Sequence, residues 1–170
     1  FSFLYDSSDY PSSVTVPFKA ADDTDDSSFT YYLHDNGNMD STRPTADSQQ
    51  VVNLAESAGS WTASQISRNK ILSDASAIVY INHKDLQKWS PKMAVQAALT
   101  YGNTTLDTDS ITLDRTNLLS TSLKPYRFSF DDIGSGIELT YGKKIGLRLS
   151  LENTTSVNNL FRTVQIYFDS

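Results

Sequence analysis

The feature that most constrains the fold is a series of short runs in which apolar and polar residues alternate. Such a period of two places one set of side chains in a core and the other in solvent, as in a half-buried β-strand. The clearest runs are 14–18, 29–33, 75–81, 93–101, 110–113, 126–130, 136–141, 145–151 and 163–168. Turn-forming Asp, Asn, Ser and Gly fill the intervals, and Pro91 interrupts the one stretch that could hold a helical turn. We therefore predict an all-β fold, an antiparallel two-sheet β-sandwich or jelly roll.

The charge balance excludes several classes of partner. The chain carries 20 acidic and 14 basic residues, a formal net charge of −6, whereas binding to a nucleic-acid backbone needs clustered Lys and Arg. No run approaches the roughly 18 apolar residues of a membrane-spanning helix. The chain has no cysteine, so disulfides cannot staple the fold. We expect an acidic β domain with neither a nucleic-acid partner nor a membrane span.

The two ends of the chain are similar to each other. Phe3-Leu4-Tyr5-Asp6-Ser7 stands near the start and Ile166-Tyr167-Phe168-Asp169-Ser170 at the end, each with three large apolar residues before Asp-Ser. The N-terminal copy continues into the first alternating run. The side chains of this segment that we expect to pack as a strand are Phe1, Phe3, Tyr5, Tyr10, Val14, Val16 and Phe18.

Two further motifs carry a family resemblance. They are Tyr31-Tyr32-Leu33-His34-Asp35-Asn36 and Met39-Asp40-Ser41-Thr42-Arg43-Pro44-Thr45. With these motifs the whole chain resembles the tandem β-sandwich, jelly-roll-like domains of large secreted surface proteins of bacteria and archaea. In those domains a strand resembling Tyr5 to Ser12 comes last, whereas here it comes first. The resemblance implies an extracellular or cell-surface location and assigns no catalytic or ligand-binding residue.

The resemblance also implies that the chain is divided into three parts. Residues 29–170 form a β-sandwich domain that lacks its final strand, 1–18 form a donor-like strand segment, and 19–28 form an acidic linker. The N-terminal strand could complete its own domain or that of the next subunit. Alternatively, the sequence is a piece of a tandem array taken slightly out of phase.

An apolar tail and an open sheet edge both invite pairing with another chain, and strand addition satisfies both. A head-to-tail contact of this kind does not close and generates a filament. We predict a structural subunit that assembles with copies of itself by donor-strand complementation. The alternative is a carbohydrate-binding or calcium-binding adhesive module of a larger surface protein, with polysaccharide as its partner.

Acidic loops make calcium the possible cofactor, because hard cations prefer several carboxylate and carbonyl oxygens. None of the loops has the spacing of an EF-hand. The candidate ligands are Asp22, Asp23, Asp25, Asp26, Asp35, Asn36, Asn38 and Asp40. Asp107, Asp109 and Asp114 form a further cluster. The competing interpretation is that Asp simply favours turns and keeps the surface soluble.

Other signals point to binding rather than catalysis. Trp89, in a long polar connection, is the candidate platform for stacking a sugar ring, although aromatic side chains more often pack in a core. Asn103 and Asn153 begin Asn-Thr-Thr sequons and are candidate glycan attachment sites. Neither a zinc-protease motif nor a nucleophile elbow is present. We therefore expect no enzyme.

Overall fold

The computed structural model describes residues 12–20, 26–34, 37–42, 49–53, 59–63, 70–72, 74–82, 93–113, 124–133, 137–138, 143–153 and 165–169. Every helix or strand element in these ranges is a strand, so the all-β prediction is confirmed. The strands are β1 (Ser13–Ala20), β2 (Asp26–Leu33), β3 (Asn38–Asp40), β4 (Gln49–Asn53), β5 (Gly59–Ala63), β6 (Lys70–Leu72), β7 (Ala75–Asn82), β8 (Met93–Tyr101), β9 (Thr104–Leu113), β10 (Lys124–Phe130), β11 (Ile137–Glu138), β12 (Ile145–Asn153) and β13 (Gln165–Asp169).

Hydrogen bonds connect these strands in one path, in the order β4-β13-β7-β1-β2-β3-β5-β12-β8-β9. On side branches, β10 pairs with β7, and β6 pairs with β1 and β11. The sequence predicted two separate antiparallel sheets. The short strand β3 instead pairs antiparallel with β2 and parallel with β5, which makes the sheet continuous and mixed.

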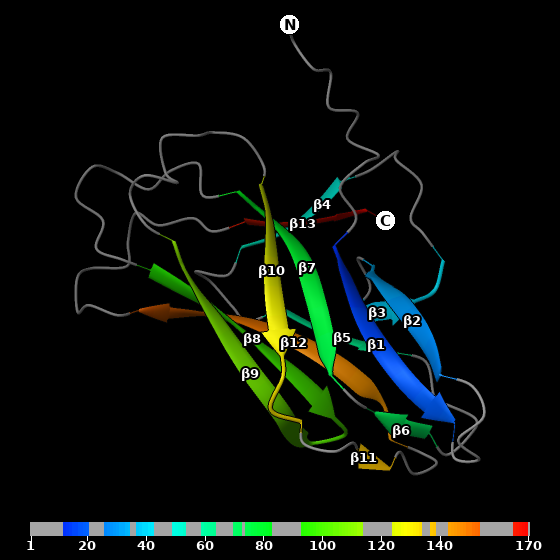
Figure 1. The fold of residues 1–170 in the computed structure, drawn as a ribbon. Helices are drawn as coiled ribbons and strands as arrows, with labels where there is room; N and C mark the ends of the chain where they lie inside the picture. The colour runs from blue at the N-terminus through cyan, green and yellow to red at the C-terminus, as the bar shows by residue number, and fades with distance from the viewer. Residues whose placement is uncertain are drawn as a thin grey trace, which may run out of the picture.

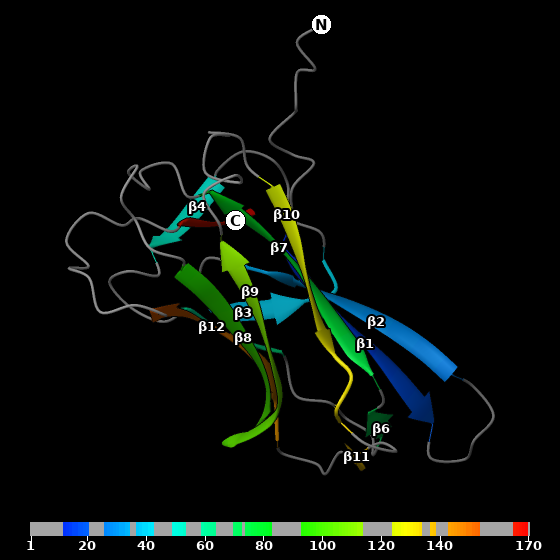
Figure 2. The same cartoon turned by 60° about the vertical axis from the view of Figure 1, so that its left-hand side comes forward.

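The path nevertheless folds so that two groups of strands face each other (Figures 1 and 2). We call β10, β7, β1 and β2 the first layer, and β5, β12, β8 and β9 the second layer. One apolar cluster contains inward side chains from both layers, which places the core between them. Its members that are 0% exposed include Val14, Val16, Val79, Ile81, Phe128 and Phe130 from the first layer, and Val95, Leu99, Ile145, Leu147 and Leu149 from the second.

Strand β1 lies inside the sheet of its own chain. It pairs with β2 along one side and with β7 and β6 along the other. Val14 and Val16 are fully buried in the shared core, and Phe18 lies in β1 opposite Ser27. Residues 13–20 therefore pair within the sheet of their own chain. Phe1, Phe3, Tyr5 and Tyr10 lie outside the described residues.

Ser12 fixes the start of β1 between its two neighbours. Its carbonyl oxygen accepts a hydrogen bond from the Leu33 N–H at 3.0 Å, and its Oγ accepts one from the Tyr80 N–H at 3.1 Å. The residue is 0% exposed, so both backbone donors have a partner inside the protein. Strands β1 and β2 also extend into the segment 19–28 that was expected to be a linker, because β1 ends at Ala20 and β2 begins at Asp26.

Candidate functional site

The outward face of the second layer is largely polar, and the core residues of β8 and β12 occupy every second position. Val95, Ala97 and Leu99 of β8 and Ile145, Leu147 and Leu149 of β12 are buried in the core. The residues between them point to the opposite face. On that face β8 presents Gln96, Ala98 and Thr100, and β12 presents Gly146, Arg148 and Ser150.

The register of β12, β8 and β9 arranges these residues in rows across the sheet, since directly opposite residues of antiparallel strands share a face. Three successive rows are Gly146–Thr100–Thr105, Arg148–Ala98–Thr108 and Ser150–Gln96–Ser110. The register shifts between Leu99 and Thr100, where Leu106 is the extra residue of β9. This bulge lets both Thr105 and Thr108 face outward while Leu106 packs against the core.

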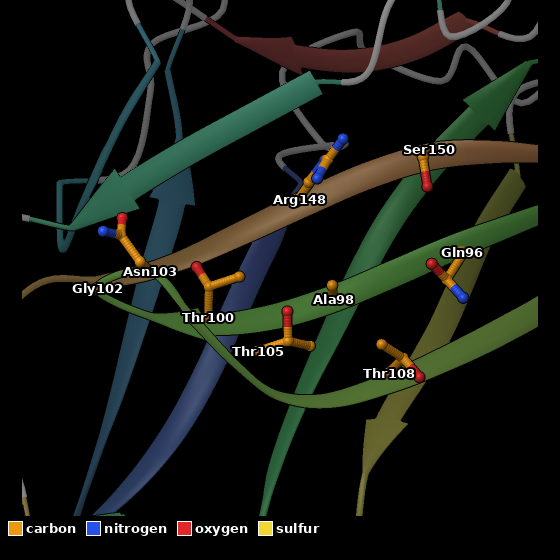
Figure 3. Close-up of a pocket in the computed structure, with 9 residues that line it drawn as sticks. All are labelled: Gln96, Ala98, Thr100, Gly102, Asn103, Thr105, Thr108, Arg148 and Ser150. Atoms are coloured by element: carbon orange, nitrogen blue, oxygen red, sulfur yellow. The ribbon is translucent and has the colours of Figure 1, made fainter.

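Ala98, in the middle of the second row, has a short side chain, and a pocket of about 310 Å³ lies among the longer polar side chains around it. Gly146 is not part of the lining: a Cβ there would lie 2.6 Å from the Thr100 Oγ1 and 3.0 Å from the Trp61 carbonyl oxygen, so that space is already filled. Figure 3 shows the lining residues on three neighbouring strands and the turn between two of them, with the short side chain of Ala98 among longer polar side chains. The lining consists of Gln96, Ala98, Thr100, Gly102, Asn103, Thr105, Thr108, Arg148 and Ser150.

The turn between β8 and β9 closes one end of this pocket. Tyr101 pairs with Thr104, so Gly102 and Asn103 are the two loop residues, and Gly102 has a φ of 61°, which favours glycine. The Gly102 N–H donates to the Lys144 carbonyl oxygen at 2.9 Å, which ties the turn to the segment before β12. Asn103, the first candidate glycan acceptor, is exposed at this turn. The second, Asn153, is the last residue of β12.

The pocket lining offers several hydrogen-bonding side chains and one charged side chain. Hydroxyl and amide groups supply donors and acceptors, and the exposed Arg148 supplies the positive charge. Within the described residues, no carboxylate forms an ion pair with Arg148. The lining residues include no Asp, Glu, His or Cys. The pocket is therefore suited to recognising a polar ligand and lacks a side chain that could act as a general acid or base near neutral pH.

The part of the predicted calcium site that the structure describes is a loop between β2 and β5. His34 Nε2 lies 2.8 Å from Asp40 Oδ1, and the same oxygen accepts the Thr42 N–H at 2.8 Å. The His34 carbonyl oxygen accepts the Trp61 Nε1–H at 3.0 Å, and the Gly37 carbonyl oxygen accepts the Thr62 N–H at 2.9 Å. The resemblance motif around His34 thus joins the two layers in this structure.

These contacts change the acidity of Asp40. Partial burial raises the pKa of its carboxyl group, but the hydrogen bonds from His34 and from the Thr42 N–H, together with the charge on His34, outweigh it. The pKa of Asp40 is therefore lowered from its ordinary value. The Asp40 carboxylate therefore has hydrogen-bond partners within the protein.

The remaining predicted calcium ligands are not brought together by the structure as it is described. Asn38 is exposed in β3, and Asp26 is the first residue of β2. Asp22, Asp23, Asp25, Asp35 and Asn36 lie outside the described residues, as does Trp89. Among the residues that are described, no three His, Cys, Asp or Glu side chains form a group that could hold a metal ion. Calcium binding remains a prediction.

Asp107 and Asp109, from the further acidic cluster, connect the edges of the two layers. Both stand opposite core residues of β8, so they lie on the inward side of β9. Asp109 accepts the Ser110 N–H at 2.9 Å and the Ser129 N–H of β10 at 2.8 Å. Asp107 accepts the Thr108 N–H at 2.8 Å and the Asp132 N–H at 3.1 Å. Their carboxylates bind backbone of both layers.

Sequence reasoning missed the pocket although it identified two of its three strands, β8 and β12; of β9 it predicted only 110–113, beyond the lining residues Thr105 and Thr108. The alternation in 93–101 and 145–151 was visible, and with it the outward Gln96, Thr100, Arg148 and Ser150. The missing information was the pairing of β12 with β8, which lie more than forty residues apart in the chain. The outward Ala98, a small residue between Gln96 and Thr100, was the one signal that could have indicated a hollow.

Comparison with known proteins gives a likeness in fold. No protein-family model and no curated protein matches this chain. Among solved structures, the chain is similar to a CocE/NonD family hydrolase from Staphylococcus aureus, with a TM-score of 0.58 and 10% sequence identity. The likeness covers 91% of this chain and 39% of the hydrolase, so the chain spans well under half of that protein. At this identity the match shows the fold alone.

The sequence also predicted that the chain does not cross a membrane. Across the described residues the structure has no helix of the length and apolar character that a membrane span requires.

Proposed function

We propose that this chain is a non-catalytic binding module of a larger extracellular or cell-surface protein, built as a two-layer, jelly-roll-like sandwich, and that it binds a saccharide. The observation that carries the proposal is the polar pocket on the outward face of β12, β8 and β9. Its volume of about 310 Å³ is at the lower end of the range for ligand sites, about 300–1,000 Å³. It would hold one or two sugar units of a longer chain.

The arrangement of the lining supports a ligand rich in hydroxyl groups. Such a ligand needs many donors and acceptors held in fixed positions, and side chains on paired strands are held more firmly than side chains on loops. Here Thr100 and Gln96 lie on β8, which is paired on both sides, and Ser150 lies on β12, which is also paired on both sides. Opposite faces of the same strands contribute to the core.

The likeness to a longer hydrolase supports the modular part of the proposal. It covers 39% of that chain, so a fold of this kind can be one part of a larger protein. The hydrolase activity in that name belongs to the Staphylococcus aureus protein. The pocket described in this chain has no titratable carboxylate or imidazole in its lining, which favours binding over catalysis.

A polysaccharide panel tests the proposal. The whole chain is titrated with soluble neutral and acidic polysaccharides, and Gln96→Ala and Thr100→Ala are each compared with Thr112→Ala, which lies on the same face of β9 outside the pocket. We expect binding to at least one polymer, weakened about fivefold or more by either pocket variant and unchanged in the control, because each lost hydrogen bond contributes about 1 kcal/mol. Absence of binding to every polymer would contradict the proposal.

We also propose head-to-tail assembly by strand donation as a second candidate. One observation favours it: β4 stands at the end of the strand order and, among the described strands, pairs only with β13. Because residues 13–20 occupy a place in their own sheet, the donated strand would have to come from residues 1–11.

Two truncations distinguish assembly through residues 1–11 from the contribution of β1 to the stability of its own domain. Removal of residues 1–11 leaves β1 intact, so we expect oligomers of the full chain to become folded monomers in size-exclusion chromatography. Removal of residues 1–18 also deletes the buried Val14 and Val16, and we expect this chain to lose cooperative unfolding. A full chain that is monomeric at every concentration would rule out assembly.

A further inference from the structure

We infer that the saccharide bound in this pocket is acidic, and that Arg148 pairs with a carboxylate of a uronic-acid unit. The inference rests on the proposed function and adds the charge of the ligand and the residue that recognises it. The observations that carry it are the position of Arg148 in the pocket, the absence of another charge in the lining, and the hydrogen-bond partners of Asp107 and Asp109 on β9.

Arg148 is placed to reach a ligand from the middle of the sheet. It lies on β12 in the row with Ala98 and Thr108, and its neighbour Ala98 has no side chain long enough to contact the guanidinium. The Arg148 side chain is exposed, and it stands at the β12 side of the pocket (Figure 3). A guanidinium presents paired N–H groups that match the two oxygens of a carboxylate.

The pocket lining differs in charge from the chain as a whole. The chain has a net charge of −6, yet the nine lining residues contain one cation and no anion. Asp107 and Asp109, on the neighbouring strand β9, lie on its inward side and accept backbone N–H groups. Arg148 is the charged side chain among the nine lining residues, and the Lys143 side chain, which lies beside Gly102 at the closed end of the pocket, adds a further positive charge.

The neutral part of the lining distinguishes an acidic sugar from a simple anion. A phosphate or sulfate ion would use the guanidinium and would not need the hydroxyl groups of Thr105 and Ser150. A nucleic acid would require several cations along its backbone, whereas the lining contains one. A sugar ring with one carboxylate and several hydroxyls matches both parts of the pocket.

The test compares acidic polymers with matched neutral forms on the whole chain. The probes are polygalacturonate, alginate and hyaluronate, together with fully methyl-esterified polygalacturonate, in which the same ring has lost its charge. We expect an acidic polymer to bind about tenfold to a hundredfold more tightly than the neutral ester, as for a charged hydrogen-bonded pair. Raising the salt concentration should reduce this preference.

Variants assign the effect to one side chain. Arg148→Gln should remove the preference for the acidic polymer, and Arg148→Lys, which keeps the charge without the paired N–H groups, should retain part of it. Arg127→Gln is the matched control, because Arg127 is an exposed arginine on β10 of the first layer. It should bind as the original chain does. Thermal unfolding of each variant shows whether the fold is kept, and Arg148→Lys supports the test if Arg148→Gln does not fold.

The outcomes separate the inference from the proposed function. Equal binding of the acidic polymers and the neutral ester would overturn the inference and leave saccharide binding standing. Binding of polyglutamate as tight as that of the acidic polymers would overturn it as well, because charge alone would then suffice. Absence of binding to any polymer, acidic or neutral, would overturn both.

Discussion

The two layers meet along two seams that are closed in different ways. At the first seam, formed by β2, β3 and β5, backbone ladders continue from one layer to the other, and the His34 carbonyl oxygen binds the Trp61 indole. At the second seam, between β9 and β10, the described strands are joined by the carboxylates of Asp107 and Asp109. Backbone pairing fixes the distance between strands, whereas a side-chain bridge spans a wider gap. Inward carboxylates also protect an edge strand from pairing with another chain.

The largest expected effect is at the first seam. Trp61 is 2% exposed and belongs to the core cluster, so Trp61→Ala should lower the free energy of unfolding by about 3–5 kcal/mol. Trp61→Phe keeps most of the ring and removes the indole N–H, so its cost should be smaller. Urea unfolding followed by circular dichroism measures both. A cost below about 1 kcal/mol for the alanine variant would show that this seam does not depend on Trp61.

An intermediate effect is expected at the second seam. Asp109→Ala leaves the half-buried Ser129 N–H and the Ser110 N–H without the carboxylate, and should cost about 1–3 kcal/mol. Asp107→Ala should cost less, because one of its donors belongs to the exposed Asp132. Asp131→Ala, at an exposed aspartate just after β10, is the control and should change stability by less than about 0.5 kcal/mol. Equal costs at Asp109 and Asp131 would mean that the carboxylate bridge contributes nothing.

The smallest effect concerns pH at the first seam. Because the pKa of Asp40 is lower in the folded chain than its ordinary value, its contribution is fully present above the unfolded pKa of about 3.9 and is lost as the pH falls through the lowered value. The carboxylate is 45% exposed, so the contribution should be only about 0.2–1 kcal/mol. Unfolding free energies measured from pH 6 to pH 2 should show this loss for the original chain and not for Asp40→Asn. The same pH dependence in both would exclude Asp40 as its source.

The sequence indicated the strands far better than their arrangement. Alternation identified β7, β8, β10 and β12 because each has one face in the core and one in solvent. The bridging strand β3 has only three residues, too few for a period of two to be recognised. The single continuous sheet therefore could not be predicted, since it depends on this short strand pairing with both β2 and β5.

For the candidate site, too, the sequence indicated individual residues but not the groups that they contact. Asp107 and Asp109 were noted as a possible cation cluster because acidic side chains in a row suggest one. Their partners across the gap are the N–H groups of Ser129 in β10 and of Asp132 just after it, 20 and 25 residues away, so only the fold shows these two donors. Asp40 was likewise identified as a candidate ligand, and its contact with His34, six residues earlier, depends on the turn that returns the chain to β2.

The alternation of β8 and β12 also separates what holds the module together from what it recognises. Residues 95, 97, 99, 145, 147 and 149 are committed to the interior, and the outward neighbours other than Gly146 can change without altering those contacts. Exchange of Ala98, Thr100 or Ser150 for larger or differently charged side chains would reshape the pocket while the hydrophobic cluster stays intact. A family of modules with different ligand preferences could therefore arise from one scaffold by substitution at every second position of two strands.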